Sequence, residues 1–302
     1  MCIRRRVFYV YVLVPVAANG ITPLMTNNKE KRTAVTCELC NLELASTAGT
    51  ADQAADEQGR EALAAIGSAL VRNDRVARRN RDYLDLHGVT AINLISTPRA
   101  GKTSLLESTI PTLIRDYRIA VLASDLAADD DIRKLRVLGV PTIQVMTGSA
   151  RHLDAHMVTR ALRDIVTPEL DLLFIESDGK LTCPASLSLG QHHNVALLSV
   201  ADGDDRPQRE PALFRAADLV LLTKTDLLVS APQFDDLRLH RNLRTIGCDA
   251  PVLGISSRRG TGIDVFCEWL RAKEALQSLH VASRSPEPQP QPQPSNPHVR
   301  YN

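Results

Sequence analysis

The sequence predicts an α/β fold in which a mostly parallel β-sheet carries helices on both faces. Short apolar runs alternate with stretches of helical character over positions 89–279, and this alternation is typical of parallel sheets. The chain has 302 residues and 44% apolar content, so one domain of about 200 residues can bury a full core and leave extensions on either side. Sheets of this kind bind ligands beyond the carboxyl ends of their strands.

Strands are expected where apolar residues run together, and helices are expected between them. In chain order, the expected strands are 90–96, 119–124, 141–146, 171–177, 194–200, 218–223 and 251–256. The expected helices are 102–115, 129–138, 152–166, 211–216, 232–244 and 261–278. Ahead of them, the segment 73–84 carries charged and apolar residues at helical spacing and leads into the domain.

Three segments of different composition divide the chain. Residues 1–68 lack a sustained period and are expected to be a poorly structured extension, with one helix near 58–71. Residues 69–280 form the predicted domain, and residues 281–302 are a disordered tail rich in proline and glutamine. Near the start, three arginines precede a ten-residue apolar stretch that resembles part of a signal peptide. This stretch is too short to span a bilayer, and no convincing cleavage site follows it. We therefore expect a wrongly assigned start or a lineage-specific extension rather than export.

The composition argues against nucleic-acid and membrane partners and indicates a reducing compartment. The formal charge is +1 and aromatic residues make up only 4% of the chain, so neither a nucleic acid nor a membrane surface is an expected partner. The six cysteines are thinly spread, which is typical of a reducing compartment rather than of a disulfide framework. We therefore expect a cytoplasmic protein.

The most informative local pattern is a loop between an apolar strand and a helix. Residues 96–104 read Ser-Thr-Pro-Arg-Ala-Gly-Lys-Thr-Ser and fit the P-loop pattern G-x-x-x-x-G-K-[ST], with Ser96 in place of the first glycine. In such a loop the backbone N–H groups wrap phosphates, Lys102 supplies an ammonium group, and the Thr103 hydroxyl can ligate Mg²⁺. The sequence thus predicts a P-loop NTPase sheet, whose phosphate-binding residues are Ser96, Arg99, Ala100, Gly101, Lys102, Thr103 and Ser104.

A second motif favours guanine over adenine. The strand 218–223 ends in Thr223-Lys224-Thr225-Asp226, which fits the pattern [NT]-K-x-D. The Asp226 carboxylate can accept hydrogen bonds from the guanine N1–H and exocyclic amine, which adenine does not offer, and the stem of Lys224 can cover the base. Ile255, Ser256 and Ser257, at the end of the strand 251–256, are expected to form the last loop that contacts the base, with Ser256 as a binding residue. GTP is therefore the predicted nucleotide.

Carboxylates at two further strand ends suit a magnesium shell. Asp125 follows the strand 119–124, and Glu176 lies near the end of the strand 171–177 in the order Glu-Ser-Asp-Gly. Oxygen ligands of this type are those that Mg²⁺ prefers. We expect Asp125 and Glu176, with Thr103, to organise Mg²⁺, and Gly179 to approach the γ-phosphate. Lys102, Thr103, Asp125 and Glu176 are thus the candidate catalytic residues.

With these residues in view, the chain resembles the HypB family, the hydrogenase nickel-incorporation GTPases of the SIMIBI class. The resemblance covers about 73–272 and rests on seven stretches: 73–75, 93–104, 124–131, 147–158, 181–186, 203–207 and 217–228. It implies GTP hydrolysis and a nucleotide-dependent homodimer. It also implies binding of nickel or zinc during maturation of [NiFe] hydrogenase, with hydrogenase maturation proteins and the hydrogenase large subunit as partners.

The chain departs from the family pattern at two functional positions. Arg99 stands where the family usually has glycine, and the added side chain is expected to weaken GTP binding by backbone strain or to compensate by pairing with phosphate. Arg151 replaces a cysteine of the family's metal-binding pair, while His152 and Cys183 remain. Two protomers would still offer two of each, enough for a four-coordinate Ni²⁺ or Zn²⁺ site. The pair Cys37 and Cys40 lacks a visible partner pair.

The resulting hypothesis is a Mg²⁺-dependent GTPase that assists nickel insertion into [NiFe] hydrogenase. Two alternatives remain open. One is a metallochaperone or scaffold whose nucleotide site is impaired, as Arg99 and Arg151 suggest. The other is a related accessory GTPase that serves a different metalloenzyme, such as urease or a cobalamin-dependent mutase.

Overall fold

The computed structural model describes residues 34–37, 42–45, 52–124, 129–147, 153–178 and 188–284. The expectations for the basic N-terminal stretch, for Cys40 and for the proline-rich tail therefore lie outside the described residues. Among the helices of the described ranges, none is long and apolar enough to cross a membrane.

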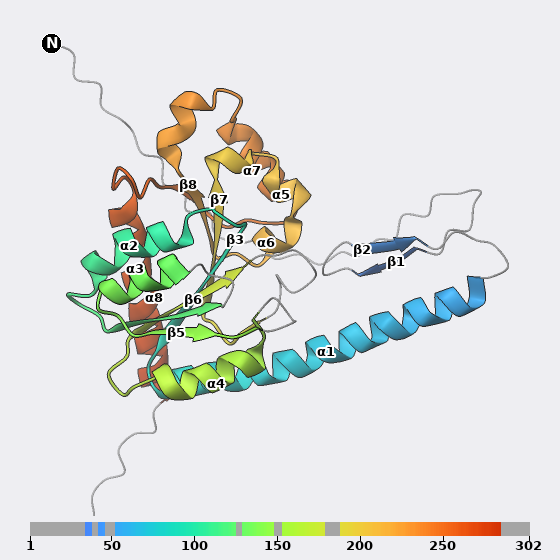
Figure 1. The fold of residues 1–302 in the computed structure, drawn as a ribbon, viewed down its shortest axis with the longest axis horizontal. Helices are drawn as coiled ribbons and strands as arrows, with labels where there is room; N and C mark the ends of the chain where they lie inside the picture. The colour runs from blue at the N-terminus through green and yellow to red at the C-terminus, as the bar shows by residue number, and fades with distance from the viewer. Residues whose placement is uncertain are drawn as a thin grey trace, which may run out of the picture.

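The centre of the fold is a seven-stranded sheet in which every pairing is parallel (Figure 1). The strand order is β5-β4-β6-β3-β7-β8-β9. The bounds are β3 Thr90–Ser96, β4 Ile119–Ser124, β5 Thr142–Val145, β6 Leu172–Asp178, β7 His193–Ser199, β8 Leu219–Thr223 and β9 Val252–Gly254. All seven expected strands are present, and the predicted α/β fold class is confirmed. β3, which leads into the P-loop, lies fourth in the sheet and is buried along its whole length.

Helices cover both faces of the sheet. On one face, α2 (Lys102–Leu113), α3 (Asp129–Val137) and α8 (Ile263–Arg284) pack in a single apolar cluster with alternate residues of the strands, including Leu94 and Phe174. The other face has two clusters. One contains α4 (Ala155–Ile165) and the end of α1 (Asp52–Leu86), and the second contains α6 (Pro211–Arg215) and α7 (Asp236–Thr245). The remaining elements are β1 (Ala34–Cys37), β2 (Leu42–Ala45), α5 (Arg206–Arg209) and two 3₁₀ turns, Val200–Asp202 and Thr225–Ser230.

The helix α1 differs from expectation. The two helical stretches near 58–71 and 73–84 are one helix of 35 residues, and it runs through position 68, where the sequence suggests a boundary. The reason is local: the segment 52–72 is rich in Ala, Glu, Gln, Leu and Arg, which are strong helix formers. The antiparallel pair of β1 and β2 also lies in the part expected to be poorly structured. At the other end, α8 extends to Arg284, past the expected end at 278.

The second half of α1 is held against the domain by side-chain hydrogen bonds to backbone groups. Asn73 accepts from the Ala155 N–H (2.9 Å) and donates to the Ser188 carbonyl (2.8 Å). Asn80 donates to the carbonyls of Ala155 (2.8 Å) and Leu189 (2.9 Å). Gly190 has φ 101°, and a Cβ there would lie 2.5 Å from the Asn80 Cβ. Glycine at 190 is therefore required for the close approach of α1.

His192 joins four elements at the end of the sheet opposite the P-loop. Its Nδ1 accepts from the Ala91 N–H (2.9 Å), so its Nε2 carries the proton and donates to Asp85 of α1 (2.9 Å). The same Asp85 oxygen accepts from Gln277 of α8 (2.6 Å). The His192 side chain is 2% exposed. Burial, with the charge of Arg81 as a second cause, lowers the pKa of His192 from 6.5 to about 4.

This shift predicts a pH-dependent stability. Because His192 is neutral in the folded chain and protonates near pH 6.5 when unfolded, its contribution is full above pH 6.5 and is lost as the pH falls toward 4. We expect the free energy of unfolding to fall between pH 7.5 and 4.5 by about 2–3 kcal/mol more in the wild type than in His192→Gln. Urea unfolding of both proteins at the two pH values measures this difference. Equal losses in the two proteins would contradict the assignment.

Candidate functional site

The P-loop connects the carboxyl end of β3 to the start of α2. β3 ends at Ser96 and α2 begins at Lys102, directly after Gly101, whose φ is 101°. The Ala100 N–H donates to the Thr97 carbonyl (3.3 Å), which closes the first turn of the loop. Since the first N–H groups of a helix have no partner within the helix, the start of α2 offers donors to an anion.

Ser96, which stands in place of the first glycine, holds the loop lysine. The Lys102 ammonium donates to Ser96 Oγ (2.9 Å), and that hydroxyl donates to the Thr97 carbonyl (2.8 Å). Ser96 is 1% exposed, whereas Lys102 and Thr103 are partly exposed. The Lys102 ammonium is thus held beside Ser96, and its flexible side chain can reach a phosphate bound in the loop.

Arg99 adopts the left-handed conformation that its position in the loop demands. Among the described residues, only Arg99 (φ 64°) and Lys224 (φ 58°) combine a side chain with a positive φ. A side chain in this region costs roughly 1–2 kcal/mol. The two residues are joined, because the Lys224 ammonium donates to the Arg99 carbonyl (2.7 Å). Strain concentrated at two bonded loop positions is typical of a functional site.

The base-reading motif contacts the same loop. The Thr223 hydroxyl donates to the Ala100 carbonyl (2.7 Å). Asp226 accepts a hydrogen bond from Ser256 Oγ (2.7 Å), and this bond lowers the pKa of the Asp226 carboxyl. Ser256 is 1% exposed, so the hydroxyl expected to contact the base instead holds the aspartate that would read it.

A pocket of about 300 Å³ lies between these two loops. Its lining residues are Ala100, Gly101, Ser104, Thr223, Lys224, Asp226, Leu227, Ser257 and Arg258. The first six are residues that the sequence predicts. Ser257 belongs to the loop that the sequence predicts to contact the base. Leu227 and Arg258 were missed, although Arg258 directly follows that loop and could have been found by extending it. Residues predicted to bind phosphate and residues predicted to read the base therefore line one pocket.

Glu176 lies within strand β6 and not in the loop at its carboxyl end. It pairs in register with Leu94, two positions before the end of β3, and is 3% exposed. Paired residues of parallel strands share a face, so Glu176 is on the face covered by α2. Asp178, which pairs with Ser96, reaches the level of the P-loop and is a position that the sequence analysis passed over.

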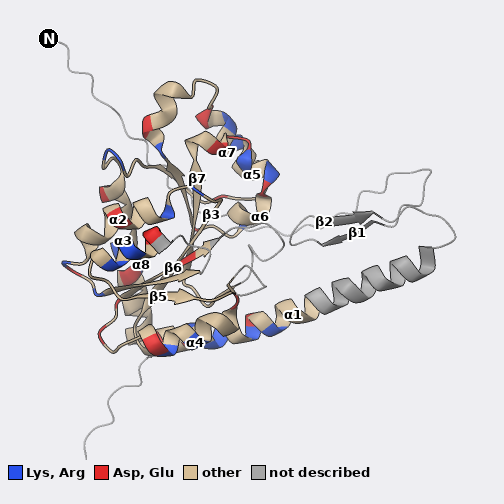
Figure 2. Cartoon of the chain, viewed as in Figure 1, with Lys and Arg blue, Asp and Glu red and all other residues tan. Residues whose placement is uncertain are grey.

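Four predicted residues lie outside the described residues: Asp125, His152, Gly179 and Cys183. Asp125 follows β4 and Gly179 follows β6, which are neighbouring strands. Within the described ranges, no group of three or more His, Cys, Asp or Glu side chains could hold a metal ion. The metal ligands thus stay predictions. Basic and acidic side chains are interspersed over α4 and α7 (Figure 2), as the net charge suggests.

Comparison with known proteins agrees with this site. Residues 91–253 match the family model "CobW/HypB/UreG, nucleotide-binding domain". The hydrogenase maturation factor HypB of Azotobacter vinelandii is 43% identical over 201 residues, which cover 67% of this chain and 66% of that protein. The chain therefore spans slightly less than two thirds of this relative.

Two solved structures are also similar. The hydrogenase maturation factor HypB from Archaeoglobus fulgidus has a TM-score of 0.63 and 30% identity, covering 68% of this chain and 99% of that one. HypB from Helicobacter pylori in complex with nickel has a TM-score of 0.63 and 31% identity, covering 68% and 97%. The family match and these likenesses show that the chain, which carries the P-loop pattern, belongs to the CobW/HypB/UreG family of nucleotide-binding proteins, in its HypB group.

Proposed function

We propose that this chain binds GTP with Mg²⁺, hydrolyses it, and assists nickel insertion during [NiFe] hydrogenase maturation. The observation that carries the proposal is a pocket lined both by the P-loop and by the loop after β8 that carries Asp226, two loops that are hydrogen-bonded to each other. Membership of the HypB group supports the role in hydrogenase maturation.

The described residues suit the triphosphate end of GTP. The N–H groups at the start of α2 and the Lys102 ammonium would bind the β- and γ-phosphates and stabilise the charge that develops as the terminal bond breaks. Thr103, with Asp125 and Glu176, would hold Mg²⁺, which neutralises phosphate charge when bound. Gly179 would approach the γ-phosphate. In P-loop enzymes positioning and electrostatics supply most of the rate, so the proposal requires no separate general base.

The base end of the pocket suits guanine. Asp226 presents a carboxylate next to Lys224, and the Ser256 hydroxyl keeps that carboxylate in place. Guanine would donate two hydrogen bonds to it, whereas adenine has no donors at the corresponding positions. These two bonds to a charged acceptor would favour guanine and would give selectivity for GTP.

The proposal also includes a metal site and protein partners. His152 and Cys183 from two protomers would form a Ni²⁺ or Zn²⁺ site in a nucleotide-dependent homodimer. The nickel complex of the H. pylori relative supports nickel as the cargo. Hydrogenase maturation proteins and the hydrogenase large subunit would be the partners. The buried free thiols of Cys248 and Cys267 fit a reducing compartment such as the cytoplasm.

One observation favours the second candidate, a scaffold whose nucleotide site is impaired. Arg99 carries a side chain at φ 64° where the loop geometry favours glycine. If the resulting strain prevented the phosphates from entering, the chain would keep its partner surfaces without turnover.

We expect the full-length chain with Mg²⁺ to hydrolyse GTP in preference to ATP, and Lys102→Ala to lower this turnover by about 100-fold or more.

Arg99→Gly should keep the activity and raise the free energy of unfolding by roughly 1 kcal/mol, because glycine adopts φ 64° without strain. Phosphate release and thermal unfolding measure the two effects. A wild type without turnover that gains it in Arg99→Gly would favour the scaffold.

Base selectivity can be tested at Asp226. In Asp226→Asn the new amide N–H₂ is a donor and cannot pair with the donor groups of guanine. It can donate to the C2 carbonyl of xanthine, the base of xanthosine diphosphate (XDP). We expect GDP to bind roughly 30-fold or more weakly, since two hydrogen bonds to a charged acceptor are lost, and XDP to bind better than GDP. Ser256→Ala, the control, should weaken GDP binding by less and leave the base preference unchanged. Equal binding of GDP and ADP by the wild type would contradict this role of Asp226.

The metal site can be tested without nucleotide turnover. Titration of the reduced chain with Ni²⁺ or Zn²⁺ should give one tight ion per two chains, and His152→Ala or Cys183→Ser should each weaken binding by about tenfold or more. Cys248→Ala is a matched control, because burial raises the pKa of the Cys248 thiol and so disfavours the metal-binding thiolate. Metal binding that survives both site variants would refute the assignment.

A further inference from the structure

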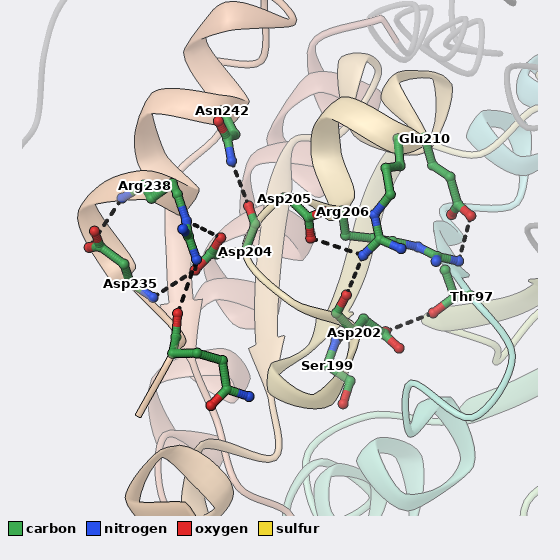
Figure 3. Close-up of polar contacts among 12 residues, drawn as sticks. Thr97, Ser199, Asp202, Asp204, Asp205, Arg206, Glu210, Asp235, Arg238 and Asn242 are labelled. Carbon is green, nitrogen blue, oxygen red and sulfur yellow. Dashed lines mark hydrogen bonds and ion pairs between the residues drawn. The ribbon is translucent and has the colours of Figure 1, made fainter. Parts of the chain in front are cut away.

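A carboxylate outside the nucleotide motifs holds the P-loop from the side. The Thr97 hydroxyl donates to Asp202 Oδ2 (2.9 Å), and Thr97 is only 3% exposed (Figure 3). Asp202 lies in the 3₁₀ turn after β7, the strand next to β3. The contact joins residues 105 positions apart in the chain.

Asp202 is itself fixed within its turn. Its carboxylate accepts from the Ser199 N–H (3.3 Å), and the Ser199 hydroxyl accepts from the Ala201 N–H (3.2 Å), which completes a capping box. The Asp202 carbonyl accepts from the Arg209 guanidinium (2.6 Å). The side chain that meets Thr97 is therefore held in position by its own turn.

The residues that follow are anchored on α7. Asp204 is 2% exposed and accepts two hydrogen bonds from Arg238 (2.5 and 2.7 Å) and one from the Asp235 N–H (2.7 Å). The Arg238 bonds lower the pKa of the Asp204 carboxyl. Asn242 donates to the Asp204 carbonyl (2.8 Å). Figure 3 shows this arrangement: α7 lies on one side of the loop and Thr97 on the other.

Nearby cations are paired elsewhere. Arg209 binds Asp205 (2.9 Å) as well as the Asp202 carbonyl, Arg206 pairs with Glu210, and Arg238 pairs with Asp204. Among the described residues, the recorded donors to the Asp202 carboxylate are the Thr97 hydroxyl and the Ser199 N–H. A carboxylate beside a phosphate-binding loop repels the phosphates, so its presence needs a compensating use.

That use lies in the geometry of Thr97. Its carbonyl accepts from both Ser96 Oγ and the Ala100 N–H and so closes the first turn of the loop. The hydrogen bond from the Thr97 hydroxyl to Asp202 fixes the rotamer of Thr97. It thereby also restricts the position of the Thr97 backbone carbonyl. We propose that Asp202 is a positioning residue that acts through Thr97 to keep the P-loop in its phosphate-binding shape. This inference rests on the proposed nucleotide binding.

The experiment measures GDP and GTP binding to the full-length chain by calorimetry with Mg²⁺, together with thermal unfolding. The variants are Asp202→Ala, Thr97→Val, their double variant and Asp202→Asn. The control is Asp205→Ala, which removes an exposed carboxylate three positions along the same loop that binds Arg209.

Asp202→Ala and Thr97→Val should each weaken binding by about five- to tenfold, the size of one lost buried hydrogen bond. The double variant should be no weaker than either single one, because both remove the same bond. Asp202→Asn keeps an acceptor for Thr97 and loses the charge, so its affinity should equal or exceed that of the wild type. Asp205→Ala should bind as the wild type does.

Other outcomes overturn the inference. Wild-type affinity in both single variants would mean that the bond does not shape the loop, even where the unfolding temperature falls. Additive losses in the double variant would mean that the two residues act separately. An equal loss in Asp202→Asn and Asp202→Ala would assign the effect to charge instead of hydrogen bonding. A wild type that binds neither nucleotide would overturn the proposed function as well, which separates the two failures.

Discussion

The candidate site depends on two hydrogen bonds between the loop after β8 and the P-loop. Thr223 and Lys224, consecutive in the chain, donate to the carbonyls of Ala100 and Arg99, also consecutive. Since a trans peptide directs its N–H opposite to its carbonyl, a carbonyl held by Thr223 fixes the direction of the Gly101 N–H. The residues proposed to read the base therefore also orient the loop proposed to bind the phosphates. This coupling explains why both kinds of residue line one pocket.

The same bonds stabilise an unfavourable backbone. Arg99 and Lys224 each occupy the left-handed region, which costs roughly 1–2 kcal/mol for a residue with a side chain. Each is held there by a bond to the other, and Lys224 is further fixed by its place between Thr223 and the 3₁₀ turn Thr225–Ser230. Local preference and overall fold disagree at these two positions, and such disagreement is expected at functional sites.

Features that are contiguous in the sequence could be predicted from it. The apolar runs predicted all seven strands of the large sheet, and the P-loop and Thr223–Asp226 predicted six of the residues that line the pocket. Long-range pairings carried no such signal. Ser256 meets Asp226 across 30 positions and Asp202 meets Thr97 across 105, so the roles of Ser256 and Asp202 appear only in the folded chain. The strand order, and the register that pairs Glu176 with Leu94 inside the sheet, also depend on the tertiary structure and could not be predicted from local sequence. The continuity of α1 was missed because helix-forming residues without a clear period were read as unstructured.

Arg99 is the residue on which the two functional readings diverge, and its surroundings favour an active site. β3 is tied to both neighbours by polar side chains, since Asn93 accepts from Ser177 (2.9 Å) and donates to Asn194 (3.1 Å). Above these residues, the P-loop is held through the Arg99 and Ala100 carbonyls and through Thr97. All of these bonds are made with arginine at position 99. The arginine side chain is exposed, so its cost is backbone strain and not a collapsed loop. A loop that keeps its shape at that cost retains the geometry that phosphates require, which supports a GTPase rather than an impaired scaffold.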